Sequence, residues 1–224
     1  MKARGLLFVS MLTLLAVGLA VSSASESKSN GSDTTKKGSQ SKEDGSQPKS
    51  VEHKNFVVDK SHARIGFKVA HLVISKVHGS FGDFDATLHL HGDELAKASA
   101  TIKVASIDTG NKDRDDHLRK ADFFDAAKYP TITFHGKSTK KVDGKTIMVG
   151  DMTIKGKKKE IELEYTLKGP VKDPFGGPAK VGVEATGTIN RKDFGVEWNK
   201  VLETGGVVVG EEVDLLIDLE AVQK

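Results

Sequence analysis

Apolar and polar residues alternate along the chain from residue 56 onward, a pattern typical of β-strands that bury one face. Between residues 63 and 69, for example, Ala63, Ile65, Phe67 and Val69 are separated by charged residues or glycine. Seven further segments repeat the pattern, at residues 84–90, 98–104, 132–134, 148–154, 161–167, 181–189 and 213–219. The sequence therefore predicts eight strands, each with one face directed at a common core.

The alternation and the turns between the strands also indicate how the strands pair. Sharp alternation favours antiparallel pairing with one solvated face over a parallel sheet that helices cover. Turn residues such as Asp143-Gly144 separate the segments. A sandwich and a closed up-and-down barrel both fit, and long strands together with the removal of exposed edges favour the barrel. We expect an all-β, eight-stranded antiparallel barrel with a long connection, around residues 113–128, that carries short helical turns.

Small residues occupy many inward positions of the expected barrel. An eight-stranded barrel can be filled by side chains or can enclose one elongated ligand. Small inward residues leave room for a ligand, although they also permit close packing of the walls. We interpret them as the sign of an internal apolar cavity, and we keep a filled barrel that acts through its surface as the alternative. The small inward residues are Ala63, Ala86, Ala98, Ala100, Ala185 and Gly187.

The first 24 residues have the layout of a secretory signal peptide. Lys2 and Arg4 precede an uncharged apolar run at residues 6–21, and the small residues Ser22-Ser23-Ala24 follow it. A helix over that run would span roughly 24 Å, which is short of the ~30 Å hydrocarbon core of a membrane. We therefore predict a signal peptide at residues 1–24 and a periplasmic or secreted protein.

Residues 25–50 contain no hydrophobic residue, so they cannot bury enough apolar area to offset the entropy of ordering. We predict a disordered Ser/Lys-rich tether there and one folded domain at residues 51–224. The chain has no cysteine, which excludes disulfides and thiol catalysis. Loss of residues 1–24 removes two positive charges, so the net charge falls from +3 to 3 − 2 = +1. A nearly neutral chain gives no electrostatic reason to expect nucleic acid as a partner.

The long connection contains a dense run of acidic residues and one histidine at residues 108–125. Counted from Asn111, the spacing of its oxygen-bearing side chains is similar to that of a calcium loop. The sixth position of such a loop requires glycine for a sharp turn, and here it is Asp116. Four interleaved Lys and Arg residues would also compensate the carboxylates. We therefore predict ion-paired closures of a structural connection instead of a metal site.

Other candidate sites have little support. His89 and His91 share one face of a strand, but that face is opposite to the inward one, and no third ligand follows at a recognisable spacing. The chain has no Gly-x-Ser-x-Gly motif. We predict no metal and no catalytic residue. An enzyme acting on a hydrophobic substrate is the rival hypothesis, and His62 and His71 are its candidate titratable pair.

Four long segments resemble the bacterial YceI-like proteins: DKSHARIGFKVAHLVISKVHGSF at residues 59–81, the stretch from 106 to 134, ATGTINRKDFGVEWN at 185–199, and GGVVVGEEVDLLIDLEA at 205–221. The similarity extends over residues 56–221, in order and with matching spacing. The resemblance implies an extended lipocalin-like barrel that is exported to the periplasm or beyond. It also implies a hydrophobic tunnel for long amphiphiles, with polyisoprenoids and isoprenoid quinones as the best-known ligands.

From the resemblance and the inward parity, we predict a non-enzymatic carrier whose ligand is an isoprenoid lipid or quinone, with no other cofactor. His71 shares the parity of the inward residues and is the candidate partner of the ligand head group, with a satisfied core histidine as the alternative. Phe123 and Phe124 are expected to press on the barrel or its mouth. The predicted ligand-binding residues are Ile65, Phe67, Val69, His71, Leu88, Ile102, Phe123, Phe124, Ile132, Phe134, Leu163, Tyr165, Val183, Trp198 and Leu215.

The expected partner is a long-chain amphiphile, and neither a nucleic acid nor a metal is expected. The basic run Lys155-Gly156-Lys157-Lys158-Lys159 is interpreted as a solvated hairpin tip, with affinity for anionic lipid head groups as the alternative. A transient contact with a membrane surface and a homodimer are both left open.

Overall fold

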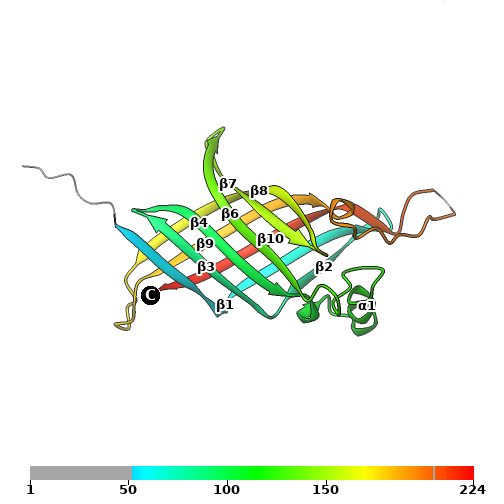
Figure 1. Cartoon of the computed structure of the whole chain (residues 1–224), viewed down its shortest axis with the longest axis horizontal. Coiled ribbons are helices and arrows are strands. Elements are labelled where there is room, and N and C mark those ends of the chain that lie inside the picture. The colour runs from blue at the N-terminus through cyan, green and yellow to red at the C-terminus, as the bar shows by residue number, and fades with distance from the viewer. Residues whose placement is uncertain (1–51, 204) are drawn as a thin grey trace, which may run out of the picture. The chain divides into compact units, whose positions relative to one another are not determined.

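The computed structural model describes residues 52–203 and 205–224, so the predicted signal peptide and tether lie outside the described residues. In this part of the chain, one helix, α1 (Lys112–Leu118), and two 3-10 turns, η1 (Val104–Ser106) and η2 (Arg191–Phe194), accompany the strands (Figure 1). Within the described ranges, no helix has the length and apolar composition needed to cross a membrane. The strands are β1 (His53–His71), β2 (Ser75–Phe81), β3 (Phe84–His91), β4 (Glu94–Lys103), β5 (Ile107–Asp108), β6 (Thr131–Val142), β7 (Lys145–Ile154), β8 (Lys157–Val171), β9 (Lys180–Asn190) and β10 (Val209–Gln223).

Hydrogen bonds join the strands into one closed antiparallel barrel. Neighbouring strands follow the order β1–β3–β4–β6–β7–β8–β9–β10, and β10 pairs back with β1. β2 continues the line of β3 along the second half of β1, and β5 continues the line of β4 beside β2. The ten labelled strands therefore form an eight-stranded up-and-down barrel, which confirms the fold predicted from the alternation.

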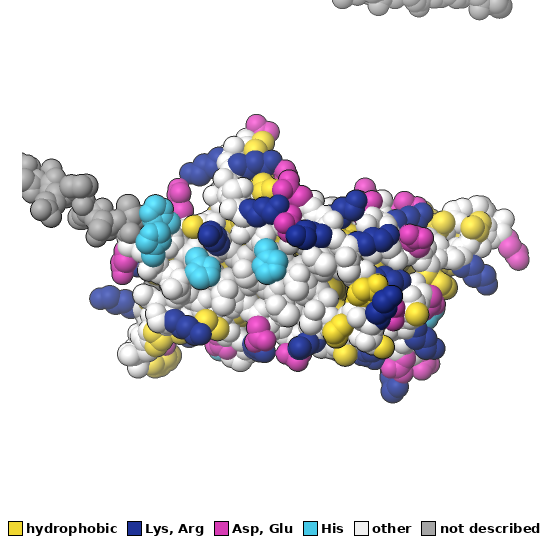
Figure 2. Space-filling view, in the orientation of Figure 1, with side chains coloured by type: hydrophobic (Ala, Val, Ile, Leu, Met, Phe, Trp, Pro, Cys, Tyr) yellow, Lys and Arg dark blue, Asp and Glu magenta, His cyan; other side chains and the backbone are white. Residues whose placement is uncertain are grey.

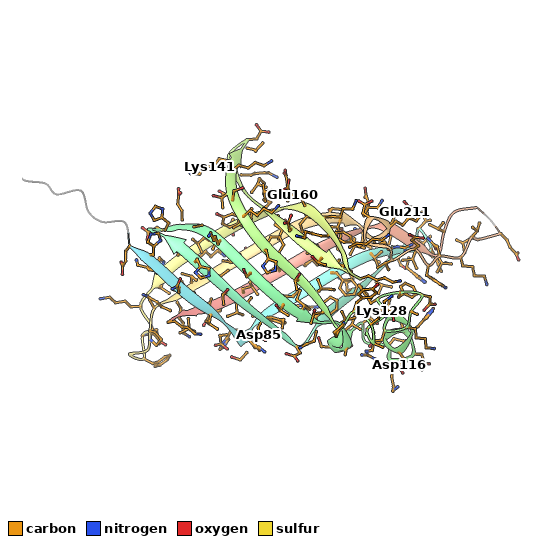
Figure 3. The ribbon with its side chains drawn as sticks, in the orientation of Figure 1. Asp85, Asp116, Lys128, Lys141, Glu160 and Glu211 are labelled. Atoms are coloured by element: carbon orange, nitrogen blue, oxygen red, sulfur yellow. The ribbon has the colours of Figure 1, made fainter. Side chains whose placement is uncertain are left out.

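The outer wall of the barrel is polar and carries ion pairs between strands (Figure 2). Lys140 Nζ lies 2.6 Å from Glu162 Oε1, and Lys145 Nζ lies 2.8 Å from Glu164 Oε2. Such exposed pairs each contribute little to stability. The β6–β7 hairpin, marked by Lys141, projects away from the wall (Figure 3). The interior and the ends of the barrel are therefore the candidates for a functional site.

Two inward glycines allow aromatic rings to lie against the wall of the barrel. A Cβ atom on Gly79 would lie 2.4 Å from Cζ of Phe67, and one on Gly150 would lie 2.6 Å from Cζ of Phe134. Real Cβ atoms do not come so close to a ring. Each phenylalanine ring therefore occupies space that the side chain of any residue other than glycine would fill at position 79 or 150. The two rings therefore pack into the wall beside the glycines.

The connection between η1 and β6 lies at one end of the barrel and begins with a capped helix (Figure 1). Asn111 Oδ1 accepts a hydrogen bond from the backbone N–H of Arg114 at 3.0 Å, which satisfies a free donor of the first turn of α1. The buried carboxylate of Asp115 accepts hydrogen bonds from the backbone N–H of Thr109, at 3.0 Å, and from its hydroxyl, at 2.6 Å. These bonds fix α1 to the chain that leads into it.

Arg119 ties the other end of α1 to the barrel. Its guanidinium donates hydrogen bonds to the carbonyl oxygens of Ala105, at 2.9 Å, and Ile107, at 2.8 Å, and pairs with Asp116 at 2.9 Å. Lys112 also pairs with Asp116, and its hydrogen bond lowers the pKa of that carboxyl group. The polar closures predicted for the charged half of the connection are present.

Candidate functional site: an apolar cavity inside the barrel

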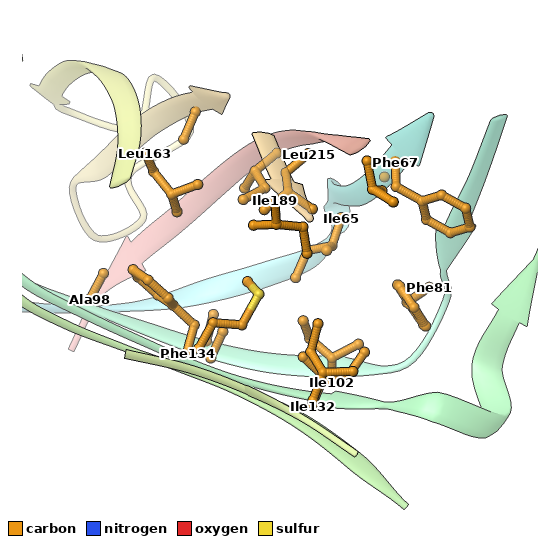
Figure 4. Close-up of a pocket in the computed structure, with 18 of the residues that line it drawn as sticks. Ile65, Phe67, Phe81, Ala98, Ile102, Ile132, Phe134, Leu163, Ile189 and Leu215 are labelled. Atoms are coloured by element: carbon orange, nitrogen blue, oxygen red, sulfur yellow. The ribbon is translucent and has the colours of Figure 1, made fainter. Parts of the chain in front are cut away.

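An apolar cavity of about 180 Å³ lies inside the barrel (Figure 4). Its lining comes from nearly every strand and from the connection that contains α1, and among the described residues the surface facing it is apolar. Along β10 the lining extends from Leu219 to Val213, a regularly paired stretch that spans roughly 20 Å at about 3.3 Å per residue, and continues to Val209. The cavity is therefore long, and its wall is suited to a hydrocarbon chain.

Thirteen of the fifteen residues predicted to bind ligand line this cavity. The structure brings together side chains from seven strands and from the apolar half of the long connection. Contact of these residues with a ligand stays a prediction. The thirteen are Ile65, Phe67, Val69, Leu88, Ile102, Phe123, Phe124, Ile132, Phe134, Leu163, Tyr165, Val183 and Leu215.

His71 does not belong to the cavity lining. The pairing of β1 with β2 stays regular from Val69 to His71, and the register shift at this point lies in β10, whose Val209 is opposite His71. His71 is half-buried at the end of β1 and pairs with Ser75 of β2. Contact of His71 with a ligand head group therefore stays a prediction, and the structure places this residue at the end of β1, beyond the cavity lining. His62, its partner in the enzyme hypothesis, is exposed and also lies off the cavity wall.

Trp198 also lies off the cavity wall and packs at its end. Its ring centroid is 5.1 Å from that of Phe123 and 5.2 Å from that of His117. Phe123 is buried and lines the cavity. Trp198 therefore supports a lining residue from behind instead of lining the cavity itself.

Several lining residues escaped the sequence-based prediction. For those on β7 and β9 the signal was present, because Met148, Met152, Ile154 and Ile189 share the inward parity. For some others the signal was absent, because they lie in β2, at the start of β4 or in the irregular segment after β9, where alternation is broken. These others include Phe81, Leu95, Phe194 and Val196.

The two ends of the barrel differ in packing. At the end that carries the β3–β4 turn, Phe56, Leu90 and Leu95 are 0%, 1% and 2% exposed, so side chains fill the interior. At the opposite end, Phe67 and Phe124 line the cavity and are only partly buried. The cavity is therefore closed at the first end, here called the filled end. At the second, here called the open end, it reaches the connection that contains α1.

A histidine–aspartate pair borders the cavity at the open end. His117 Nε2 lies 2.6 Å from Asp122 Oδ2, and this hydrogen bond lowers the pKa of Asp122. The imidazole also stands edge-on to the ring of Phe123, with centroids 4.9 Å apart. The pair therefore holds the connection in place over a residue that lines the cavity.

Arg191 organises the loop that precedes β10. Only 6% of its surface is exposed, and burial lowers its pKa. Its guanidinium donates hydrogen bonds to the carbonyl oxygens of Val196, at 2.6 Å, Gly210, at 2.7 Å, Trp198, at 3.0 Å, and Val209, at 3.3 Å. A buried cation satisfied by carbonyl oxygens thus fastens this loop to the open end.

One cluster in the described part of the chain has the composition of a metal site. Asp59, His62 and Glu220 bring ligand atoms within 4.8 Å of one another, at a bulge of β1. These groups are already paired, since His62 Nδ1 lies 2.9 Å from Asp59 and Lys180 Nζ lies 2.8 Å from Glu220. Hydrogen bonds from Ser61 and His62 hold the pKa of Asp59 well below its usual range. The cluster lies at the surface and does not contribute to the cavity.

Known proteins match both the sequence and the fold. Residues 56–221 match the family model described as YceI-like domain. A UPF0312 protein of Staphylococcus aureus strain MSSA476 is 41% identical over 161 residues, which cover 71% of this chain and 92% of that protein. The crystal structure of Burkholderia cenocepacia BcnA matches with a TM-score of 0.63 and 27% identity, over 74% of this chain and 99% of BcnA. A polyisoprenoid binding domain from Saccharophagus degradans has the same fold, with a TM-score of 0.57 and 12% identity over 76% of this chain and 98% of that domain.

Proposed function

The chain belongs to the YceI-like family, and we propose that it is a carrier that holds a long apolar molecule, such as a polyisoprenoid or an isoprenoid quinone, inside its barrel. The observation that carries this proposal is the long apolar cavity, closed at one end by Phe56, Leu90 and Leu95. A blind apolar cavity accepts a hydrocarbon tail and leaves a polar head group at the open end.

The physics of burial supports a ligand of this kind. Each buried CH₂ group contributes about 0.8 kcal/mol, so ten tail carbons offer about 8 kcal/mol before the cost of ordering the chain. An apolar wall supplies this term without any specific polar contact. The length of the tail, more than the chemistry of the head group, would then set the affinity.

Two further observations favour binding over catalysis. The histidines that an enzyme hypothesis needs, His62 and His71, lie off the cavity wall. The Saccharophagus degradans domain, which shares the fold, is described as polyisoprenoid-binding. We propose the same class of ligand for this chain.

Export is a separate proposal that rests on residues 1–24, outside the described part of the chain. Amino-terminal sequencing of the protein recovered from outside the cytoplasm is expected to begin after Ala24. Recovery of an intact amino terminus from the cytoplasm would contradict it.

Organic extraction of the purified full chain, followed by mass spectrometry, tests the carrier proposal. We expect a long-chain isoprenoid or similar amphiphile in the extract. Stripped protein is then expected to take up added polyprenol or quinone. An empty extract together with no uptake would contradict the proposal.

A further inference from the structure

Three apolar side chains are exposed on two loops at the open end. Val73 and Ile74, in the turn between β1 and β2, are 75% and 86% exposed, and Val201, between η2 and β10, is 75% exposed. The loops touch, since the backbone N–H of Leu72 donates to the carbonyl oxygen of Val208 at 2.9 Å. We call residues 72–74 with Val201 the apolar tip. The loop that carries Val201 extends beyond the strands, and apolar side chains are visible on it (Figures 1 and 2).

The backbone of the tip indicates that these side chains have a use. Leu72 and Val73 have φ angles of 53° and 66°, in the left-handed region. Glycine or asparagine adopts this conformation with little strain, whereas a β-branched residue such as valine is a genuine outlier there. Exposed apolar side chains at strained positions do not stabilise the folded barrel. They point to an interaction outside it.

The tip is continuous with the cavity. Val69 of β1 and Val209 of β10 line the cavity, and each lies within three residues of the hydrogen bond that joins the two loops. Apolar surface therefore leads from the interior to the tip at the open end. At the filled end, Phe56 and Leu90 block the interior. A carried molecule has its route in and out beside the tip.

The size of the tip favours a bilayer over a protein as its partner. A stable protein interface buries about 800 Å² on each partner, which three aliphatic side chains on a convex pair of loops cannot supply. Shallow insertion by about 5–10 Å into the boundary between head groups and acyl chains requires only a few such side chains. Lys200 is exposed beside the tip, but Lys76 is paired with Asp214 at 3.8 Å and Glu203 is exposed on the same loop, so the apolar side chains and not charge carry the contact.

We propose that the apolar tip inserts into the surface of a lipid bilayer and sets the open end of the cavity against the membrane. The carried amphiphile then passes between bilayer and cavity without crossing water. This inference rests on the proposed carrier function and adds the surface through which the carrier loads. The lysine-rich turn at Lys155–Lys159 is the competing site on the same molecule.

A site-specific label tests the docking directly, because the chain has no cysteine. Ile74→Cys carries an environment-sensitive fluorophore, and Phe175→Cys, whose native side chain is 95% exposed in the β8–β9 loop, is the matched control. With vesicles of phosphatidylcholine and phosphatidylglycerol, we expect a blue shift and quenching by a bilayer-embedded nitroxide at position 74 alone. The readout is local, so binding by another segment of the full chain does not produce it.

Two outcomes would overturn the inference. One is a label at position 74 that stays in water, and the other is an equal response at positions 74 and 175. A blue shift at Lys158→Cys in place of position 74 would assign docking to the lysine-rich turn and would equally overturn it.

Lipid transfer supplies the functional readout. The double variant Val73→Ser, Ile74→Ser is expected to move ligand between vesicles about tenfold more slowly than the unmodified chain, because two inserted side chains are lost. Phe175→Ser is expected to transfer at the unmodified rate, and both variants are expected to retain the same amount of ligand after purification. Unchanged transfer by the double variant contradicts docking at the tip. An unmodified chain that holds no lipid instead contradicts the carrier function, so the two failures are distinguishable.

Discussion

The filled end and the open end of the barrel are built from the same strands, yet they have different contents. At the filled end, inward side chains such as Phe56 and Leu90 touch one another and leave almost no exposed surface. At the open end, inward residues such as Phe67 and Phe124 face a cavity under the connection that contains α1. The same alternation thus produces a filled core at one end and a cavity at the other. Whether an end is filled or hollow therefore depends on which inward side chains face one another across the barrel.

The largest expected difference between the ends is in stability. Phe56→Ala removes a fully buried ring from the filled end and is expected to cost about 3–5 kcal/mol of unfolding free energy. Phe124→Ala, at the open end, is expected to cost less than half as much, because this ring is partly exposed and borders empty space. Urea denaturation followed by circular dichroism measures both. Equal losses would show that the two ends are equally packed.

A smaller effect is expected from the connection that covers the open end. Asp115→Ala leaves the N–H and hydroxyl of Thr109 without their acceptor and is expected to cost about 1–3 kcal/mol. Hydrogen exchange should accelerate in α1 and leave the filled end protected. Asp113→Ala, an exposed position on the same helix, is the control and is expected to change stability by less than about 0.5 kcal/mol. Uniform acceleration across the barrel would contradict a separate, locally fastened cover.

The smallest expected effect is a pH response confined to the open end. The hydrogen bond with His117 lowers the pKa of Asp122 below its ordinary value of 3.8 in the folded protein. Stabilisation by this pair is therefore fully present above pH 3.8 and is lost as the pH falls through the lower folded-state pKa. Trp198, the only tryptophan, stands beside His117, so its emission should change in this range before far-ultraviolet circular dichroism does.

Asp122→Asn is the matched variant for this response, since it keeps the shape of the side chain and removes its titration. We expect a smaller change in Trp198 emission below about pH 4 in this variant than in the unmodified chain. An identical change in both would assign the response to other carboxyl groups.

The filled end and the walls could be predicted from the sequence, whereas much of the open end could not. Period-two alternation correctly placed Leu88, Ile102 and Leu163 inward, because regular pairing preserves parity along a strand. It could not show where the lining ends, since His71 shares the parity of Val69 but lies beyond the cavity at the end of β1. Phe194 and Val196 lie in and beside a 3-10 turn, where no period exists to interpret. The missed residues of the open end thus lie where the backbone departs from regular strand pairing.

For the apolar half of the long connection, the position against the barrel could be predicted, whereas its contacts with other loops could not. Phe123 and Phe124 were expected to press on the barrel or its mouth, and both line the cavity. The packing of Trp198 against Phe123 could not be predicted, since 198 − 123 = 75 positions separate these residues and only tertiary packing joins them. Sequence parity gives the face of a strand, and it gives no contacts between loops.

Ligand occupancy in a cavity-blocking variant tests the central claim most directly. Ala100→Phe places a ring in the cavity from its wall, and Thr101→Phe places the same ring on the outer face of the same strand. Native mass spectrometry is expected to show bound lipid in the unmodified chain and in Thr101→Phe. Ala100→Phe is expected to be empty while its circular dichroism spectrum remains that of a folded barrel. Equal lipid occupancy in a folded Ala100→Phe would contradict a ligand held inside the barrel.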